Sequence, residues 1–531
     1  MHARLPNERL GLSYSLSALS GALLALSFPR YGHPAFGWIA LVPLLLALSG
    51  WRGQPGPLPG QPPRRALWFG MVTGLVYFAG TVYWTSNVLA VFGGMPMILA
   101  VVAMLVLAAY LAIYPAIAAM VLASLIARAG RSALFFAPAA WIATEYLRGL
   151  LFGGFPWVPL GNSQVTVLAV AQVASVLGVY GLSALVALVN ASIAYALLST
   201  GRSRIIAIAS TMLLLVGIAV WGSGRVADGS LTREGTPLRV GLIQGNVAQA
   251  DKLAPTPQIS RRIFTTYLAM TRDAVRRGAQ YVIWPESSTP FTFGHDAAGD
   301  AALRELAREV GVPILIGSDQ IVAEPELKMY NAAFLLGTDG DTIAVYRKIH
   351  LVPFGEFFPM QEWLTFAAPL VKRFLPFTPG DSVVMLPVDG HPTSTAICYE
   401  VVFPSLMREA VLQGSELLTT VTNDGWYGTS SAPYQHFEMA AMRAIEAGRY
   451  LARAANTGIS GVVDPYGRVV QASAIFEQVG LVVETRLLSS RTIYSQIGDV
   501  IAYVAMALIV IALVVVRPRT QNVAQSPKPR A

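Results

Sequence analysis

Residues 393–400 read Thr-Ser-Thr-Ala-Ile-Cys-Tyr-Glu, and this stretch decides the fold of the polar part of the chain. A short β-rich run ends here in Cys398, the only cysteine among 531 residues. Two other short apolar runs end in a chemically useful side chain in the same way, at Glu286 and at Lys348. Residues that follow different strands can meet at one edge of a sheet. We therefore expect Glu286, Lys348 and Cys398 to form one site.

Short β-rich runs alternate with helix-like segments from about Leu238 to Thr485. The strand-like runs include residues 239–243, 281–284, 313–316, 393–397 and 417–421. Helical patterns lie at about 257–277, 300–310, 404–413 and 434–448. Alternation on this scale indicates an α/β domain whose strands are buried in a sheet.

The rest of the chain has the composition of an integral membrane protein. Hydrophobic residues make up 54% of the chain, charged residues 13%, and the mean hydropathy is +0.53, which is too apolar for a soluble protein. A helix needs about 20 apolar residues to cross the hydrocarbon core. The sequence predicts about eight spans, at roughly 11–28, 34–50, 67–91, 97–127, 133–150, 166–198, 204–222 and 498–516. The span at 97–127 contains Pro115, and the span at 166–198 contains Gly178 and Gly181, so both are expected to kink or to extend beyond the bilayer.

Basic residues in the short loops predict the orientation of these spans, because cytoplasmic loops carry the excess of Lys and Arg. They gather in alternate loops and in the tail: Arg4, Arg9, Arg52, Arg64, Arg65, Arg128, Arg131, Arg202, Arg204, Arg517, Arg519, Lys528 and Arg530. Both termini are therefore expected in the cytoplasm and the polar domain on the far side, which in a bacterium is the periplasm. Residues 25–27 also loosely fit a signal-peptide cleavage site, and cleavage there would leave the polar domain on the same side.

Four segments follow from this pattern. They are a transmembrane helical domain at 1–225 with about seven spans, an extracytoplasmic catalytic domain at 237–490, a C-terminal transmembrane helix at 496–516, and a cytoplasmic tail at 517–531. The net charge of +8 gives no reason to expect a nucleic-acid partner, because much of the excess lies in the loops and the tail. A single cysteine excludes an intramolecular disulfide.

The three reactive residues suit nucleophilic catalysis. A cysteine attacks as a thiolate, and its ordinary pKa near 8.5 leaves it mostly protonated at neutral pH. Glu286 can accept the proton, and Lys348 can stabilise the thiolate and then the oxyanion of a tetrahedral intermediate. Helical residues after Cys398 would direct backbone amides at that oxyanion. Taken singly, each residue has a plain structural interpretation, and the occurrence of all three favours catalysis.

Histidine chemistry has weaker support. His350 and His436 have no second His or Cys at ligand spacing, so we expect structural hydrogen bonds and no metal.

The contexts of Glu286, Lys348 and Cys398 resemble the nitrilase superfamily. That resemblance implies an αββα sandwich, with two central sheets between helix layers, and a thioester or thioimidate on the cysteine. Nearly the whole chain resembles the apolipoprotein N-acyltransferase family. The stretches that carry this are Phe155-Pro156-Trp157, Gln244-Gly245-Asn246, Trp284-Pro285-Glu286-Ser287, Lys348 with Leu351 to Glu356, Cys398-Tyr399-Glu400, Asn423 to Gly428, and Gln435-His436.

The resemblance implies catalytic roles for Glu286, Lys348 and Cys398. It also implies supporting or substrate-binding roles, which we assign to Glu356, Tyr399, Glu400, Trp157 and Trp426. Two of these have plainer alternatives, since Trp157 could be an interfacial anchor and Trp426 could simply pack a turn. The family often has Lys-Trp where this chain has Lys252-Leu253, which puts an aromatic substrate contact in doubt.

The implied activity is a two-step acyl transfer at the bacterial inner membrane. Cys398 would take an acyl chain from a phospholipid, phosphatidylethanolamine in this family, and pass it to the N-terminal amine of a diacylated apolipoprotein. The resemblance implies no metal and no organic cofactor. The segment from Trp363 to Pro379 could be a mobile lid over the lipid or a plain interfacial loop.

Two other functions fit the sequence less well. A membrane-tethered nitrilase-like amidase would use the same three residues with water as the acceptor and a small periplasmic amide as the substrate. A transporter or scaffold with an inactive domain would need a polar path, and few charges lie inside the spans.

Overall fold

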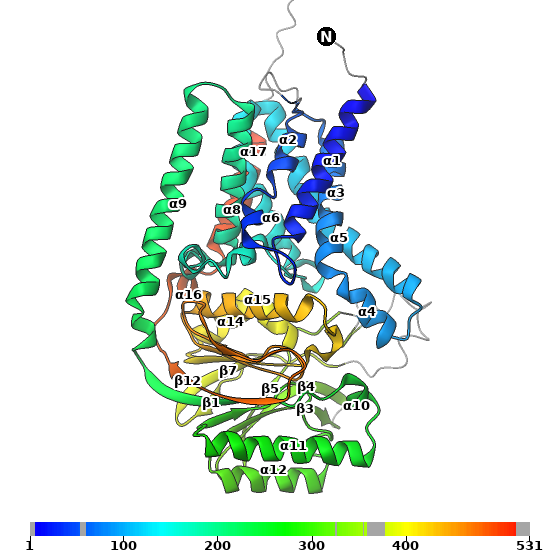
Figure 1. The fold of residues 1–531 in the computed structure, drawn as a ribbon, viewed down its shortest axis with the longest axis vertical. Helices are drawn as coiled ribbons and strands as arrows, with labels where there is room; N and C mark the ends of the chain where they lie inside the picture. Colours follow the sequence, from blue (N-terminus) through cyan, green and yellow to red (C-terminus); the bar gives the residue numbers. More distant parts are fainter. Residues whose placement is uncertain are drawn as a thin grey trace, which may run out of the picture.

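The computed structural model describes residues 6–51, 53, 60–323, 326–353, 355–357 and 377–516. A bundle of apolar helices stands on one side of two facing β-sheets, and both are joined into one molecule (Figure 1). The expected lid falls almost wholly outside the described residues, as does the tail at 517–531.

The helical bundle contains the predicted apolar helices. They are α1 (Pro6–Ala25), α2 (Val42–Leu48), α3 (Pro63–Val82), α4 (Trp84–Val91), α5 (Met97–Ala129), α6 (Ala137–Arg148), α7 (Leu168–Ala171), α8 (Ala174–Leu198), α9 (Arg202–Asp228) and, from the far end of the chain, α17 (Val500–Val515). Within the described residues, 4 helical stretches are long and apolar enough to cross a membrane, and three shorter apolar helices accompany them. A helical membrane region is thus confirmed, while the count of about eight spans stays a prediction.

Several expected spans are divided in the structure. The stretch 67–91 forms α3 and α4, and the stretch 133–150 forms a 3-10 turn followed by the 12-residue α6. Inside α8, Gly178 has a φ of 67°, and a Cβ there would lie 2.4 Å from the ring of Tyr494. Glycine therefore allows this break and the close packing of Tyr494 against it.

Helix α5 runs past Pro115 without interruption for 33 residues. At 1.5 Å per residue it is about 50 Å long, which exceeds the hydrocarbon core of about 30 Å. The expectation that this span extends beyond a bilayer is consistent with that length, and Figure 1 shows α5 and α4 projecting beyond the bundle.

The polar half of the chain forms two six-stranded sheets. The first has the order β12 (Val479–Leu487), β1 (Thr236–Gln244), β2 (Tyr281–Ile283), β3 (Ile314–Val322), β4 (Lys328–Leu336), β5 (Thr342–Arg347). The second has the order β11 (Val469–Ala472), β10 (Gly461–Val463), β9 (Leu451–Ala455), β8 (Leu417–Thr422), β7 (His391–Ile397), β6 (Leu386–Val388). Strands β1 to β3 and β7 to β9 are parallel neighbours, as the strand and helix alternation predicts.

Helices cover the outer faces of both sheets. Helices α11 (Pro257–Arg276) and α12 (Ala297–Val310) lie outside the first sheet, while α14 (Pro404–Leu412) and α15 (Ala432–Ala447) lie between the second sheet and the membrane helices (Figure 1). All six residues of β8 are buried, because α14 and α15 cover one face of the second sheet and the first sheet covers its opposite face. The αββα sandwich expected from the sequence is confirmed.

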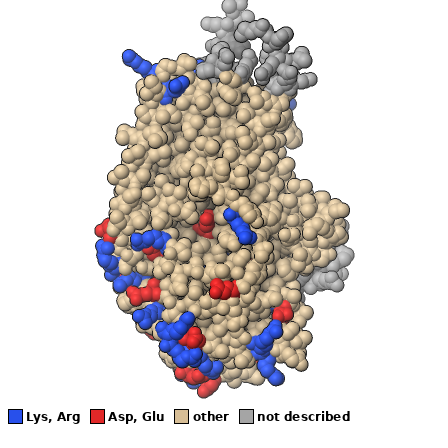
Figure 2. Space-filling view, in the orientation of Figure 1, with Lys and Arg blue, Asp and Glu red and all other residues tan. Residues whose placement is uncertain are grey.

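Charge is distributed unevenly over the molecule. On the face drawn in Figure 2, a broad band over the helical bundle is almost free of charged side chains. Basic side chains lie at its upper end, and acidic and basic side chains mix over the catalytic half. A band of this kind fits a surface in contact with lipid, because a charge in the hydrocarbon core is costly.

Candidate active site

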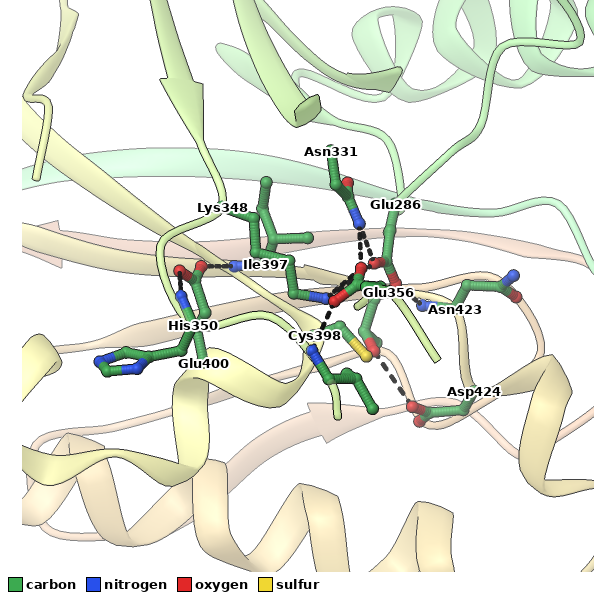
Figure 3. Close-up of polar contacts among 12 residues, drawn as sticks. Glu286, Asn331, Lys348, His350, Glu356, Ile397, Cys398, Glu400, Asn423 and Asp424 are labelled. Carbon is green, nitrogen blue, oxygen red and sulfur yellow. Dashed lines mark hydrogen bonds and ion pairs between the residues drawn. The ribbon is translucent and has the colours of Figure 1, made fainter. Parts of the chain in front are cut away.

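The structure brings Glu286, Lys348 and Cys398 together at one edge of the sandwich. Lys348 directly follows β5, Cys398 directly follows β7, and Glu286 lies three residues beyond β2. The Lys348 Nζ lies 3.4 Å from the Glu286 Oε1, and Figure 3 shows Cys398 beside both residues, whose charges act on its thiol. All three side chains are buried. Their proximity is observed, and their catalytic role stays a prediction.

A sharp backbone turn aims the cysteine into this site. Cys398 ends the run of β7, opens a short 3-10 helix over Cys398–Val402, and has a φ of 53°. Such a left-handed conformation is costly for a residue other than glycine and persists only where the surroundings hold it. One such contact is the His436 Nε2, which lies 3.0 Å from the Cys398 carbonyl oxygen.

Hydrogen bonds fix both oxygens of the Glu286 carboxylate. Its Oε1 accepts from the Asn331 Nδ2 at 2.7 Å, and its Oε2 accepts from the Asn423 backbone N–H at 2.9 Å. Sequence reasoning missed Asn331. The available signal was an amide near the start of the otherwise apolar run from Tyr330 to Leu336, where a buried polar group needs a partner.

Glu356 lies closer to the lysine than Glu286 does. Its Oε1 accepts from the Lys348 Nζ at 2.8 Å and from the Asn331 Nδ2 at 2.9 Å, while its Oε2 accepts from the Val352 N–H at 2.8 Å. Burial by itself lowers the pKa of Lys348, but the carboxylates of Glu356 and Glu286 outweigh it and raise that pKa above its usual value. Lys348 is therefore a fixed cation beside the cysteine.

The cysteine itself is a neutral thiol at rest. Burial, followed by the charge of Glu286, raises the pKa of Cys398 to about 12, although Lys348 acts in the opposite direction. Burial disfavours the charged sulfur and a carboxylate adds like charge, so the attack needs a base that takes the thiol proton. The expectation that Glu286 is that base stays a prediction.

Glu400 connects the backbones on either side of the site. Its Oε1 accepts from the Tyr346 hydroxyl and from the N–H groups of Ile349 and His350, and its Oε2 accepts from the Ile397 N–H at 2.6 Å. Burial raises the pKa of Glu400 to about 7 despite these bonds. The carboxyl group thus ties the segment after Lys348 to the residue before Cys398, and its supporting role stays a prediction.

Aromatic residues join the site to the membrane helices. The Tyr399 hydroxyl donates to the Gly154 carbonyl at 3.2 Å, and the Trp157 Nε1 donates to the Gln435 Oε1 at 2.8 Å. Trp157 is 1% exposed, and its ring lies 5.6 Å from that of His436. Its buried position between the two halves favours a supporting role over contact with substrate.

Trp426 also lies at this junction. Its ring packs edge-on against Phe92, just after α4, with centroids 5.2 Å apart. Leu253, which stands where the family often has tryptophan, is 53% exposed at the end of α10 (Gln249–Leu253).

His436 forms hydrogen bonds, as expected. Burial, and then Arg453, lower its pKa. Its Nε2 lies 3.0 Å from the Cys398 carbonyl oxygen, and its Nδ1 lies 3.0 Å from both the Arg453 Nη2 and the Asp424 Oδ1. The Arg453 Nη2 also lies 2.9 Å from the Asp424 Oδ2. Among the described residues, no group of three His, Cys, Asp or Glu side chains is arranged to hold a metal ion.

Two facing sheets with a buried Glu-Lys-Cys cluster define a carbon-nitrogen hydrolase domain, and the model of the carbon-nitrogen hydrolase family matches residues 239–491. The model of the apolipoprotein N-acyltransferase N-terminal domain matches residues 20–192. The chain is 38% identical to apolipoprotein N-acyltransferase of Geobacter metallireducens, over 94% of this chain and 95% of that one. It is 35% identical to the enzyme of that name from Methylococcus capsulatus, over 91% and 92% of the two chains. The chain therefore belongs to the apolipoprotein N-acyltransferase family and is a membrane-embedded bacterial enzyme.

Proposed function

We propose that this protein transfers an acyl chain from a membrane phospholipid to the N-terminal amine of the diacylglyceryl-cysteine of an apolipoprotein. The family to which the chain belongs supports a lipoprotein as the acceptor. The observation that carries the proposal is the position of the nucleophile. Tyr399, the residue after Cys398, donates a hydrogen bond to Gly154 in the helical half, so the segment that carries the nucleophile lies against the apolar helices.

In the first step the Cys398 sulfur attacks the ester carbonyl carbon of the phospholipid. Glu286 takes the thiol proton during the attack, because the thiol is neutral at rest. The Lys348 ammonium stabilises the oxyanion that forms on the former carbonyl oxygen. The carbon–oxygen bond to glycerol then breaks, Glu286 returns the proton to the leaving oxygen, and a lysophospholipid departs from an acyl thioester on Cys398.

In the second step the free amine of the lipoprotein attacks the thioester carbonyl. The carbon–nitrogen bond forms, the carbon–sulfur bond breaks, and Glu286 passes the proton lost by the amine to the departing sulfur. Glu356 and Asn331 do not react. They hold Lys348 and Glu286 in place through the bonds described above, at 2.7 to 2.9 Å.

The membrane location suits this chemistry. Both substrates are lipids, and moving their chains into water would cost about 0.8 kcal/mol per CH2. We place the enzyme in the inner membrane, with about seven spans in 1–225, an eighth at 496–516, the catalytic domain of 237–490 in the periplasm and both termini in the cytoplasm. The donor is phosphatidylethanolamine, and neither a metal nor an organic cofactor takes part.

The test is a complete reaction with defined substrates. Purified enzyme is mixed with phosphatidylethanolamine in detergent micelles and with a synthetic diacylated lipopeptide that has a free amine. The lipopeptide should gain the mass of one acyl chain with wild-type enzyme and remain unchanged with Cys398→Ala. Release of free fatty acid or hydrolysis of a small amide, with the lipopeptide unchanged, would instead support the amidase.

A further inference from the structure

Asp319 lies beside the reactive cluster but has no part in the mechanism above. It belongs to β3, where the register places it directly opposite Asn331 of β4. Side chains of directly opposed residues in an antiparallel pair lie on the same face of the sheet. The Asn331 side chain points to the carboxylates of Glu286 and Glu356 (Figure 3). The Asp319 side chain therefore lies on the face of the sheet that holds the active site.

The neighbours of Asp319 along β3 confirm this direction. The Ser318 hydroxyl contacts Thr289 and Phe293, and the Gln320 side chain accepts from Arg347. Side chains alternate between the two faces of a strand. Ser318 and Gln320 thus occupy the opposite face and leave Asp319 directed toward Glu286.

The Asp319 carboxylate is unpaired and half-buried. Its side chain forms no hydrogen bond and no ion pair with any residue that the structure describes. Burial, with added repulsion from Glu286 and Glu356, raises the pKa of Asp319 to about 6, although the charge of Lys252 acts in the opposite direction. A half-buried carboxylate that receives no hydrogen bond from the protein has its acceptor oxygens available to a substrate group.

The nearby ammonium groups are already engaged. The Lys252 Nζ donates to the carbonyl oxygens of Ser287 at 2.9 Å and Glu286 at 3.3 Å. Lys348 is held between Glu356 and Glu286. Two ammonium groups thus face the three carboxylates of Glu286, Glu356 and Asp319. The surplus carboxylate suits a cationic group and disfavours a bare phosphate.

We propose that Asp319 binds the primary ammonium group of a substrate next to Cys398. This inference rests on the proposed function, which supplies two sources of that group. One is the N-terminal ammonium of the acceptor lipoprotein, and the other is the ethanolamine headgroup of the donor. Both are primary ammonium ions, so the chemistry of recognition is the same and only the step affected differs.

The test separates the two half-reactions in Asp319→Asn, which keeps the shape and removes the charge. Acyl-enzyme is formed either from phosphatidylethanolamine or from p-nitrophenyl palmitate, an activated ester without a headgroup. The acyl-enzyme made with the second donor is then given the diacylated lipopeptide at several concentrations. Intact mass follows every step. Asp341→Asn, an exposed carboxylate between β4 and β5, is the matched control.

Loading from p-nitrophenyl palmitate should match wild type, which also shows that the variant is folded. If Asp319 binds the headgroup, Asp319→Asn should load from phosphatidylethanolamine about tenfold or more slowly than wild type. If Asp319 binds the acceptor, the variant should need a lipopeptide concentration higher by a similar factor for transfer. Equal rates in all arms, or equal slowing in all of them, would overturn the assignment. Failure of the wild-type enzyme to form any acyl-enzyme would instead count against the proposed function.

Discussion

Replacing Lys348 with methionine should destabilise the protein strongly, in addition to stopping the reaction. The Lys348 ammonium lies 2.8 Å from Glu356 and 3.4 Å from Glu286, and both carboxylates share the Asn331 amide. Methionine leaves these buried carboxylates facing each other without the cation. Removing one partner of a buried ionic group costs about 3–5 kcal/mol. At about 2–4 °C per kcal/mol for a domain of this size, Tm should fall by about 6–20 °C.

The assay is thermal unfolding of the purified enzyme in detergent, followed by tryptophan fluorescence. The double variant Lys348→Met/Glu356→Gln also removes one of the two negative charges that repel each other. It should recover at least half of the lost Tm, although it should not form acyl-enzyme. Arg276→Met is the control, because its ion pair with Asp273 is exposed and worth under about 1 kcal/mol. A Lys348→Met enzyme as stable as the control, or a double variant that loses the sum of the single effects, would refute the reasoning.

Two further outcomes follow from the site. Glu286→Gln should lower the rate of acyl-enzyme formation by about 10²–10⁴-fold, the usual effect of losing a general base, and a rate near wild type in folded enzyme would show that another group takes the proton. Because the pKa of Cys398 is raised to about 12, alkylation of this single cysteine by iodoacetamide should accelerate steadily from pH 7 to pH 10 as thiolate forms, whereas a plateau below pH 8 would show a low-pKa thiol.

The sequence predicts the catalytic fold well because its central strands are buried on both faces. Some of these strands appear as short apolar runs, as at Tyr281–Ile283 and at the start of Ile314–Val322, and Glu286 stands just after the first of them. Pairing between distant strands leaves no such local signal. The first strand of the sandwich pairs with the last, Thr236 opposite Leu487, and only the folded chain shows it.

The membrane helices were less predictable than the sandwich. Hydropathy locates apolar stretches but not the breaks within them, such as the division of 67–91 near Tyr83 or the positive φ of Gly178. These breaks depend on packing against neighbouring helices. The same limit applies to the site, where Asn331 and Arg453 act through contacts with residues far away in the sequence.

The central claim is that Cys398 carries the acyl chain as a thioester. The most direct test is the intact mass of the purified enzyme after incubation with phosphatidylethanolamine and no acceptor. Wild type should gain one acyl chain that neutral hydroxylamine removes, and Cys398→Ala should gain none. A folded wild-type enzyme that shows no adduct, or an adduct that survives in Cys398→Ala, would contradict the account.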